Sequence, residues 1–162
     1  MPLALRSRLR DLGAVLFMGP FRAVRHPDFR RFLTGQGISL VGTWMQSIAQ
    51  GWLVLELTRS AFAVGLTSTL ATLPILFFTL YGGVVADRVD KRRFIMALQA
   101  VMLVEAAVLA ALTLTNQVTV EWIWALAVLF GLATAFEVPA RQAFLVELVP
   151  AEDLVSAAAV NS

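Results

Sequence analysis

Long apolar stretches constrain this chain more than any other feature of its sequence. A helix that crosses the roughly 30 Å hydrocarbon core of a bilayer needs about 20 mostly apolar residues. Four such windows follow one another closely, at about residues 33–57, 61–86, 94–115 and 120–138. The chain of 162 residues is only 15% charged, whereas soluble domains average about 25%. The pattern predicts an all-α integral membrane protein.

The two ends of the chain differ from its apolar middle. Residues 1–31 are expected to be a cytoplasmic N-terminal segment, in which leucines at four-residue spacing favour a helix lying on the membrane surface. A disordered basic tail is the alternative. At the other end, Pro150 followed by Glu152 and Asp153 is typical of a helix start. Residues 151–162 are therefore expected to begin a fifth, incomplete span of a partial helical half at 32–162.

Basic residues are concentrated in every second segment that flanks these windows. Seven precede the first window: Arg6, Arg8, Arg10, Arg22, Arg25, Arg30 and Arg31. Four more lie between the second and third windows, but the first loop has only Arg59 and the third has none. Short loops rich in Lys and Arg stay in the cytoplasm, so we expect a cytoplasmic N-terminus. The pI near 9.9 then reflects this bias and not a nucleic-acid partner.

Several kinds of site are excluded by composition. The chain has no Cys and a single His, His26. Disulfides and clusters of His or thiolate metal ligands are therefore excluded, and we expect no metal and no cofactor. The sequence also offers no nucleophile–base pair, which argues against an enzyme.

A charged loop with glycines before it joins the second and third windows. Its sequence is YGGVVADRVDKRR, residues 81–93. Gly83 and Asp87 are four residues apart and share one helical face. Glycine lets a neighbouring helix approach closely, and an acid at a helix C-terminus needs a partner. We expect Arg88, Arg92 or another helix N-terminus to be that partner, in a cytoplasmic latch; an ordinary stop-transfer loop is the alternative.

This loop resembles the signature of the major facilitator superfamily, Gly-x-x-x-Asp-Arg-x-Gly-Arg-Arg/Lys. Asp90 stands where the signature has its second glycine. The resemblance places a cytoplasmic gating motif on Gly83, Asp87, Arg88, Asp90, Lys91, Arg92 and Arg93. The stretches FRRFLTGQGISLVGTWMQSIAQGWLVLELTRSAFAVGL and VPARQAFLVELVPAEDLVSAAAVNS are similar to the enterobactin-exporter-like branch, also called transmembrane secretion effectors.

The resemblance implies a fold and a function. The family has twelve helices in two halves, so this chain is expected to be its N-terminal part, with four transmembrane helices and the start of a fifth. The implied function is proton-driven efflux of a small drug-like or siderophore-like molecule by alternating access, in a bacterial inner (plasma) membrane. The implied partners are the substrate, a proton gradient, the lipid bilayer and the remaining helices. A non-transporting structural or assembly protein is the alternative.

The first window carries polar residues at three- and four-residue steps. They are Gln36, Ser39, Thr43, Gln46, Ser47 and Gln50. Polar groups in hydrocarbon are costly unless paired or hydrated, so this polar stripe is a candidate cavity lining. Hydrogen bonds between helices are the alternative. Trp44 lies beside the stripe and is a candidate for stacking on an aromatic substrate or for packing.

Three charged residues lie inside or at the end of the later windows. Glu105 follows Arg93 by 12 residues, about 18 Å along a helix, and so lies near the middle of the membrane. An acid there is a candidate proton site or a neutral carboxyl bonded to another helix. Glu137 and Arg141 are possible gate partners, with Glu137 facing Arg92 or Arg93; two independent solvated charges are the alternative. Pro139 is expected to end or kink the span.

The orientation can be tested directly, because the native chain has no Cys. Single Cys residues placed at Asp90 and at Gln117 should react from opposite sides of the membrane. The measurement is labelling of intact cells with an impermeant thiol reagent. Labelling of both positions from outside would overturn the orientation.

The chain itself, as residues 1–162, is expected to insert but not to transport. The expected fifth helix is cut short, and the polar stripe has too few partner helices to enclose a cavity. No second repeat is present to move against the first.

Overall fold

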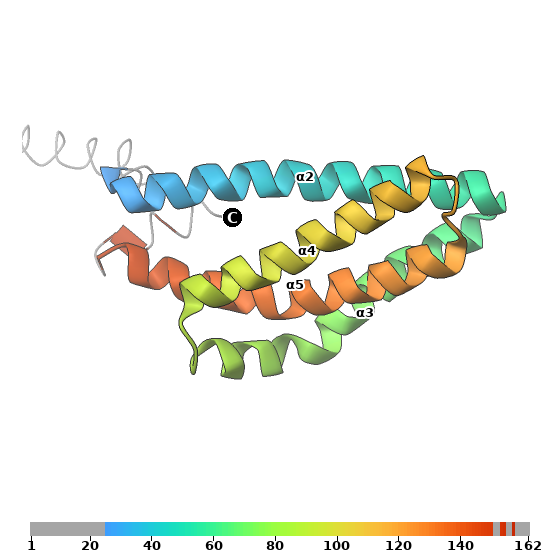
Figure 1. The fold of residues 1–162 in the computed structure, drawn as a ribbon. Helices are drawn as coiled ribbons and strands as arrows, with labels where there is room; N and C mark the ends of the chain where they lie inside the picture. The colour runs from blue at the N-terminus through green and yellow to red at the C-terminus, as the bar shows by residue number, and fades with distance from the viewer. Residues whose placement is uncertain (1–24, 151–152, 155–156, 158–162) are drawn as a thin grey trace, which may run out of the picture. The chain divides into compact units, whose positions relative to one another are not determined.

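The structure is a computed structural model that describes residues 25–150, 153, 154 and 157. These residues form four helices, α2 (Pro27–Thr58), α3 (Ala61–Ala86), α4 (Lys91–Leu114) and α5 (Val120–Leu148) (Figure 1). No strand occurs within the described residues, so the all-α fold expected from the sequence is confirmed. The expected N-terminal surface helix and most of the expected fifth helix lie outside this part of the chain.

Three of the helices are suited to a membrane by length and composition. These are α3, α4 and α5, whose most apolar windows have mean hydropathies of 1.8, 2.2 and 1.8. Although α2 is 32 residues long, it is not among them. Its polar stripe lowers its mean hydropathy, and so the first of the four expected spans stays a prediction.

The connections between helices follow local backbone chemistry. Arg59 and Asn116 adopt positive φ angles of 53° and 55° directly after helical segments, which is how left-handed residues end helices. After α4, the backbone N–H of Asn116 donates to Thr113 and that of Gln117 donates to Leu112, the pattern of a Schellman cap. The side chain of Ser60 accepts a hydrogen bond from the backbone N–H of Ala63 and caps α3.

Pro139 does not end its helix. α5 continues through it to Leu148, ten residues beyond the end expected for the fourth span. A proline inside a helix removes one backbone hydrogen bond and crowds the preceding turn. Here the ring is used in packing, because its Cγ lies close to Gly82 of α3.

Two compact units are formed, and each is described by itself. The larger is Leu40–Phe144, and the smaller combines the residues up to Ser39 with those from Leu145 onward. In the smaller unit, Phe29 is fully buried in a cluster with Leu145, Val149 and Ala157. The larger unit has two clusters, one around Val54, Leu109 and Ile123 and one of Ala86, Ile95 and Ala140.

Within the larger unit, successive helices reverse direction. Figure 1 shows the α3–α4 connection at one end and the α2–α3 and α4–α5 connections at the other. Consecutive helices of this unit are therefore antiparallel. This arrangement also places the charged residues 87–90 at the end of the unit opposite to Arg59 and Asn116.

The closest helix contact runs along α3 and α5, which we call the α3–α5 seam. The same offset of 57 residues relates Thr67 to Trp124, Pro74 to Gly131 and Gly82 to Pro139. The two helices therefore run parallel and in register, with each proline against a glycine of the other helix. At one end of the seam, the indole N–H of Trp124 donates to the Thr67 hydroxyl over 3.1 Å. Trp124 thus serves the packing of α5 against α3.

Gly82, and not Gly83, allows the close approach. A Cβ placed on Gly82 would lie 2.5 Å from the carbonyl oxygen of Ala135 and 3.0 Å from Cα of Phe136. A Cβ on Gly83 would meet nothing within 4 Å. The sequence assigned helix packing to Gly83 because that residue lies four positions before Asp87 and shares its helical face. The two neighbouring glycines lie on different sides of the helix, and only the tertiary arrangement decides which side faces α5.

The seam predicts opposite effects for the two glycines. Gly82→Ala should lower the free energy of unfolding by about 1–3 kcal/mol, because backbone atoms of α5 must move apart. Gly83→Ala should leave it unchanged or raise it by up to about 1 kcal/mol, because Ala is the better helix former. Thermal unfolding of the two detergent-solubilised variants makes the comparison. Equal melting temperatures would contradict the packing assigned to Gly82.

Candidate functional site

The charged loop is built by two helix caps. Asp87 is the C-terminal cap of α3, and its backbone N–H donates to the Gly83 carbonyl over 3.1 Å. Asp90 is the N-terminal cap of α4, and its side chain accepts from the backbone N–H of Arg93 over 2.9 Å. Asp90 has a φ of −63°, which any residue can adopt. The family's second glycine is therefore replaced by a residue that starts the next helix.

The predicted local latch is not formed at Asp87. Asp87, Arg88, Arg92 and Arg93 are all exposed. Among the residues that the structure describes, no ion pair joins the Asp87 carboxylate to Arg88 or Arg92. Its charge lies at a helix C-terminus, where an anion is disfavoured, and stays available to a partner outside the described part of the chain.

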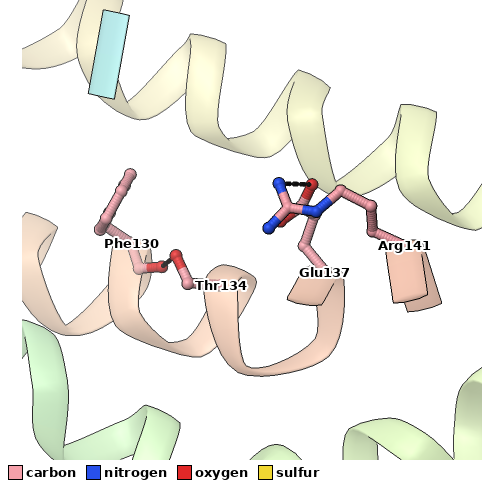
Figure 2. A network of polar contacts seen from close by, with 4 residues as sticks. All are labelled: Phe130, Thr134, Glu137 and Arg141. Carbon is pink, nitrogen blue, oxygen red and sulfur yellow. Dashed lines mark hydrogen bonds and ion pairs between the residues drawn. The ribbon is translucent and has the colours of Figure 1, made fainter. Parts of the chain in front are cut away.

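A buried ion pair lies on α5. Arg141 Nη1 is 3.2 Å from Glu137 Oε1, and the two side chains are 21% and 7% exposed. Figure 2 shows both side chains on the side of α5 that faces α4, with the guanidinium folded back over the carboxylate. The four-residue spacing makes such pairs natural within one helix.

The partner of Glu137 differs from the expected one. The sequence suggested Arg92 or Arg93, across the cytoplasmic face, but the structure pairs Glu137 with Arg141. Arg92 and Arg93 are exposed instead. Because Glu137 is only 5% exposed, its carboxylate needs a cation within its own surroundings. Arg141 can supply that charge without any movement of another helix.

A second polar contact joins α2 to α4 in the apolar part of the larger unit. Gln46 Nε2 donates to Glu105 Oε2 over 2.6 Å. Glu105 is 1% exposed, which makes it one of the most completely buried large side chains. Its other oxygen, Oε1, has no hydrogen-bond partner among the described residues, and neither does Nε2 of Gln50. This site therefore holds one bonded pair and two unsatisfied polar atoms.

The polar stripe of α2 faces inward in part. Within the larger unit, Thr43, Gln46 and Gln50 are half-buried, whereas Ser47 is exposed. Gln36 and Ser39, in the smaller unit, are also half-buried. Trp44 is exposed. The stripe is thus a contact face of the helix for every one of its expected residues except Ser47.

A groove of about 1040 Å³ lies between α2 and α4. Gln46 and Gln50 contribute to its lining, as the sequence suggested for the stripe, but Trp44 does not. Trp52 and Glu56 line it instead. The sequence did not single out Trp52 and Glu56 as lining residues, because a charge near the end of a helix is common. Their four-residue spacing was the available signal.

The single histidine also has a partner that the sequence did not indicate. In the smaller unit, His26 Nε2 lies 3.0 Å from Asp153 Oδ2. The two residues are 127 positions apart, so no local pattern could have joined them. The contact brings the start of α2 against the segment that follows Pro150.

Comparison with known proteins now bears on these sites. The family model described as transmembrane secretion effector matches residues 18–162. The chain belongs to this family. It is a branch of the major facilitator superfamily, so the resemblance expected from the loop signature is confirmed. The family is one of transporters and not of enzymes, as expected.

The chain is also similar to individual bacterial transport proteins. It is 29% identical over 118 residues to the staphyloferrin A transporter of Staphylococcus aureus, covering 72% of this chain and 30% of that protein. It is 27% identical over 130 residues to macrolide efflux protein A of Streptococcus pyogenes, covering 80% of this chain and 32% of that protein. The chain thus spans about a third of the length of these relatives. No solved structure gives a significant match.

The ion pair on α5 predicts unequal costs for single and double substitutions. Arg141→Met should lower the free energy of unfolding by about 3–5 kcal/mol, because it leaves a buried carboxylate without its cation. Adding Glu137→Gln should recover much of that loss. Thermal unfolding of the two variants measures it, with Arg92→Met at the exposed start of α4 as the matched control. A double variant less stable than Arg141→Met would contradict the pairing.

Proposed function

We propose that this protein acts in secondary active export of a small organic molecule across a bacterial plasma membrane. The observation that carries the proposal is the family match over residues 18–162. One relative supports the direction, because it is named a macrolide efflux protein. Another is named a staphyloferrin A transporter, which supports transport of a small molecule. Three described helices are long and apolar enough to cross a membrane, which agrees with a multi-pass protein.

The proposed mechanism is alternating access with a cytoplasmic gate. The loop at Asp87–Arg93 would hold the cytoplasmic helix ends together through Asp87, whose partner would come from the remaining helices of the transporter. The exposure of Asp87 and its place at a helix C-terminus support this role, since an unpaired anion there gains most from a new cationic or N–H partner. Glu137 and Arg141 would stiffen the neighbouring end of α5.

Helix packing suggests which parts move together. The α3–α5 seam brings backbone against backbone at Gly82 and Gly131, and such close contacts have few alternative arrangements. The groove between α2 and α4 is far less closely packed. In the proposed cycle α3 and α5 therefore move as one body, and changes in helix separation occur at α2 and α4.

Glu105 is the proposed site of the coupling proton. It is a carboxyl group buried in an apolar helix and bonded to Gln46 of the polar stripe. A carboxyl in that position can take up and release a proton, and intramembrane acids are frequent members of proton relays. The unsatisfied Oε1 leaves a place for a second donor during the cycle. The N-terminus would be cytoplasmic, as the basic residues predict.

Glu105→Gln tests proton coupling. Glutamine keeps the size and the hydrogen bonding of the side chain but cannot titrate. In the complete gene product, the variant should bind substrate normally and lose most gradient-driven accumulation, at least tenfold. Flux into proteoliposomes under an imposed proton gradient is the measurement, with Glu147→Gln on the exposed surface of α5 as control. Undiminished accumulation would leave Glu105 a structural residue only.

Asp87→Asn tests the gate. The substitution keeps the shape of the side chain but removes its charge. Transport by the complete protein should fall to near background while membrane insertion stays normal, because the latch loses its anion. Transport assays with surface-expression controls measure both. Wild-type rates in this variant would remove the gating role from the loop.

A further inference from the structure

The groove between α2 and α4 has an unusual charge. Glu56 lines it, and the other lining residues are apolar or uncharged, among them Met45, Gln50 and Trp52. Residues 40–58 of α2 and 95–114 of α4 contain no Lys or Arg. The lining of this groove therefore holds one carboxylate and no basic side chain, and the nearest Arg in the sequence is Arg59, directly after the end of α2.

Trp52 and Glu56 are arranged to act on one ligand. They are four residues apart on α2 and thus neighbours on the helix surface, and both line the groove. The Trp52 side chain is 70% exposed, so its ring is open to a ligand. An organic cation placed there gains from the negative face of the indole and from the carboxylate beside it. An organic anion gains from neither.

The size and the polar lining of the groove narrow the ligand further. Its volume of about 1040 Å³ is at the upper end of the roughly 300–1,000 Å³ typical of sites for drug-sized molecules. Two residues before Trp52, Gln50 also lines the groove and adds a polar side chain to it.

We propose that this groove is a binding site for apolar organic cations of drug size, with Glu56 as the counter-charge and Trp52 as the stacking surface. The inference deepens the proposed export function and rests on it for its biological role. It names the substrate class that this site admits, and it assigns recognition to two residues near the end of α2.

A pair of ions of almost equal shape and opposite charge tests the site. Tetraphenylphosphonium and tetraphenylborate differ mainly in the sign of their charge. The complete protein in nanodiscs should bind the cation at least tenfold more tightly than the anion, after subtraction of binding to empty nanodiscs. Glu56→Gln should weaken binding of the cation about tenfold, and Trp52→Leu should weaken it by several-fold. Equilibrium dialysis with labelled ions measures each dissociation constant.

Matched controls use the exposed start of α5, away from the groove. Glu121→Gln removes an exposed acid and Trp122→Leu an exposed indole, and neither residue lines the groove. Both variants should bind the cation like the wild type. Equal binding of the two ions, or an effect of Glu121→Gln as large as that of Glu56→Gln, would overturn the proposal.

Measuring both cation binding and gradient-driven flux distinguishes the groove assignment from the export function. If the cation binds through Glu56 but the complete protein shows no gradient-driven flux, the export function fails and the binding site stands. If flux is normal but binding has no preference for charge, the groove assignment fails and the export function stands.

Discussion

The backbone contact between α3 and α5 is the constraint on which the larger unit depends. Lipid tails are as apolar as leucine, so burying apolar side chains gives little drive for helices to associate in a bilayer. Close approach must supply the attraction instead. Gly82 and Gly131 remove the side chains that would hold the helices apart, and Pro139 and Pro74 fill the spaces opposite them. The Trp124–Thr67 hydrogen bond fixes the same register at a third level.

Against this close-packed pair, the polar groups of the unit fall into two kinds. Glu137 has its counter-charge in Arg141 on the same helix, and such a satisfied pair stabilises one arrangement. Glu105 has one hydrogen-bond partner, Gln46, for its two oxygens, and Gln50, four residues after Gln46 on α2, keeps an unpaired nitrogen among the described residues. An incompletely satisfied polar group in an apolar helix is costly. Because of this difference, we propose proton and ligand binding at α2 and α4 and a structural role for the ion pair on α5.

Local chemistry allowed the helices to be predicted closely. Apolar windows are read from consecutive residues, and they predicted α3 at 61–86 and the start of α4 within three residues. The Ser60 cap and the positive φ of Asn116 are local features of the structure that agree with these bounds. The end of α5 could not be placed, because whether Pro139 breaks a helix depends on what its ring contacts. In the candidate site, Glu105 and the stripe were identified by the cost of polar groups in hydrocarbon. The pairing of Glu137 and the use of Trp52 and Glu56 were not.

The sequence by itself determined that this chain is an all-helical membrane protein of the transmembrane secretion effector family, because hydropathy and the loop signature are written in consecutive residues. Only the tertiary structure decided which of two adjacent glycines packs, which arginine neutralises Glu137, and which tryptophan lines a groove. Each of those choices depends on the rotation of one helix relative to another. A turn of a helix by one residue moves a side chain by about 100°, and no pattern within a single helix fixes that angle.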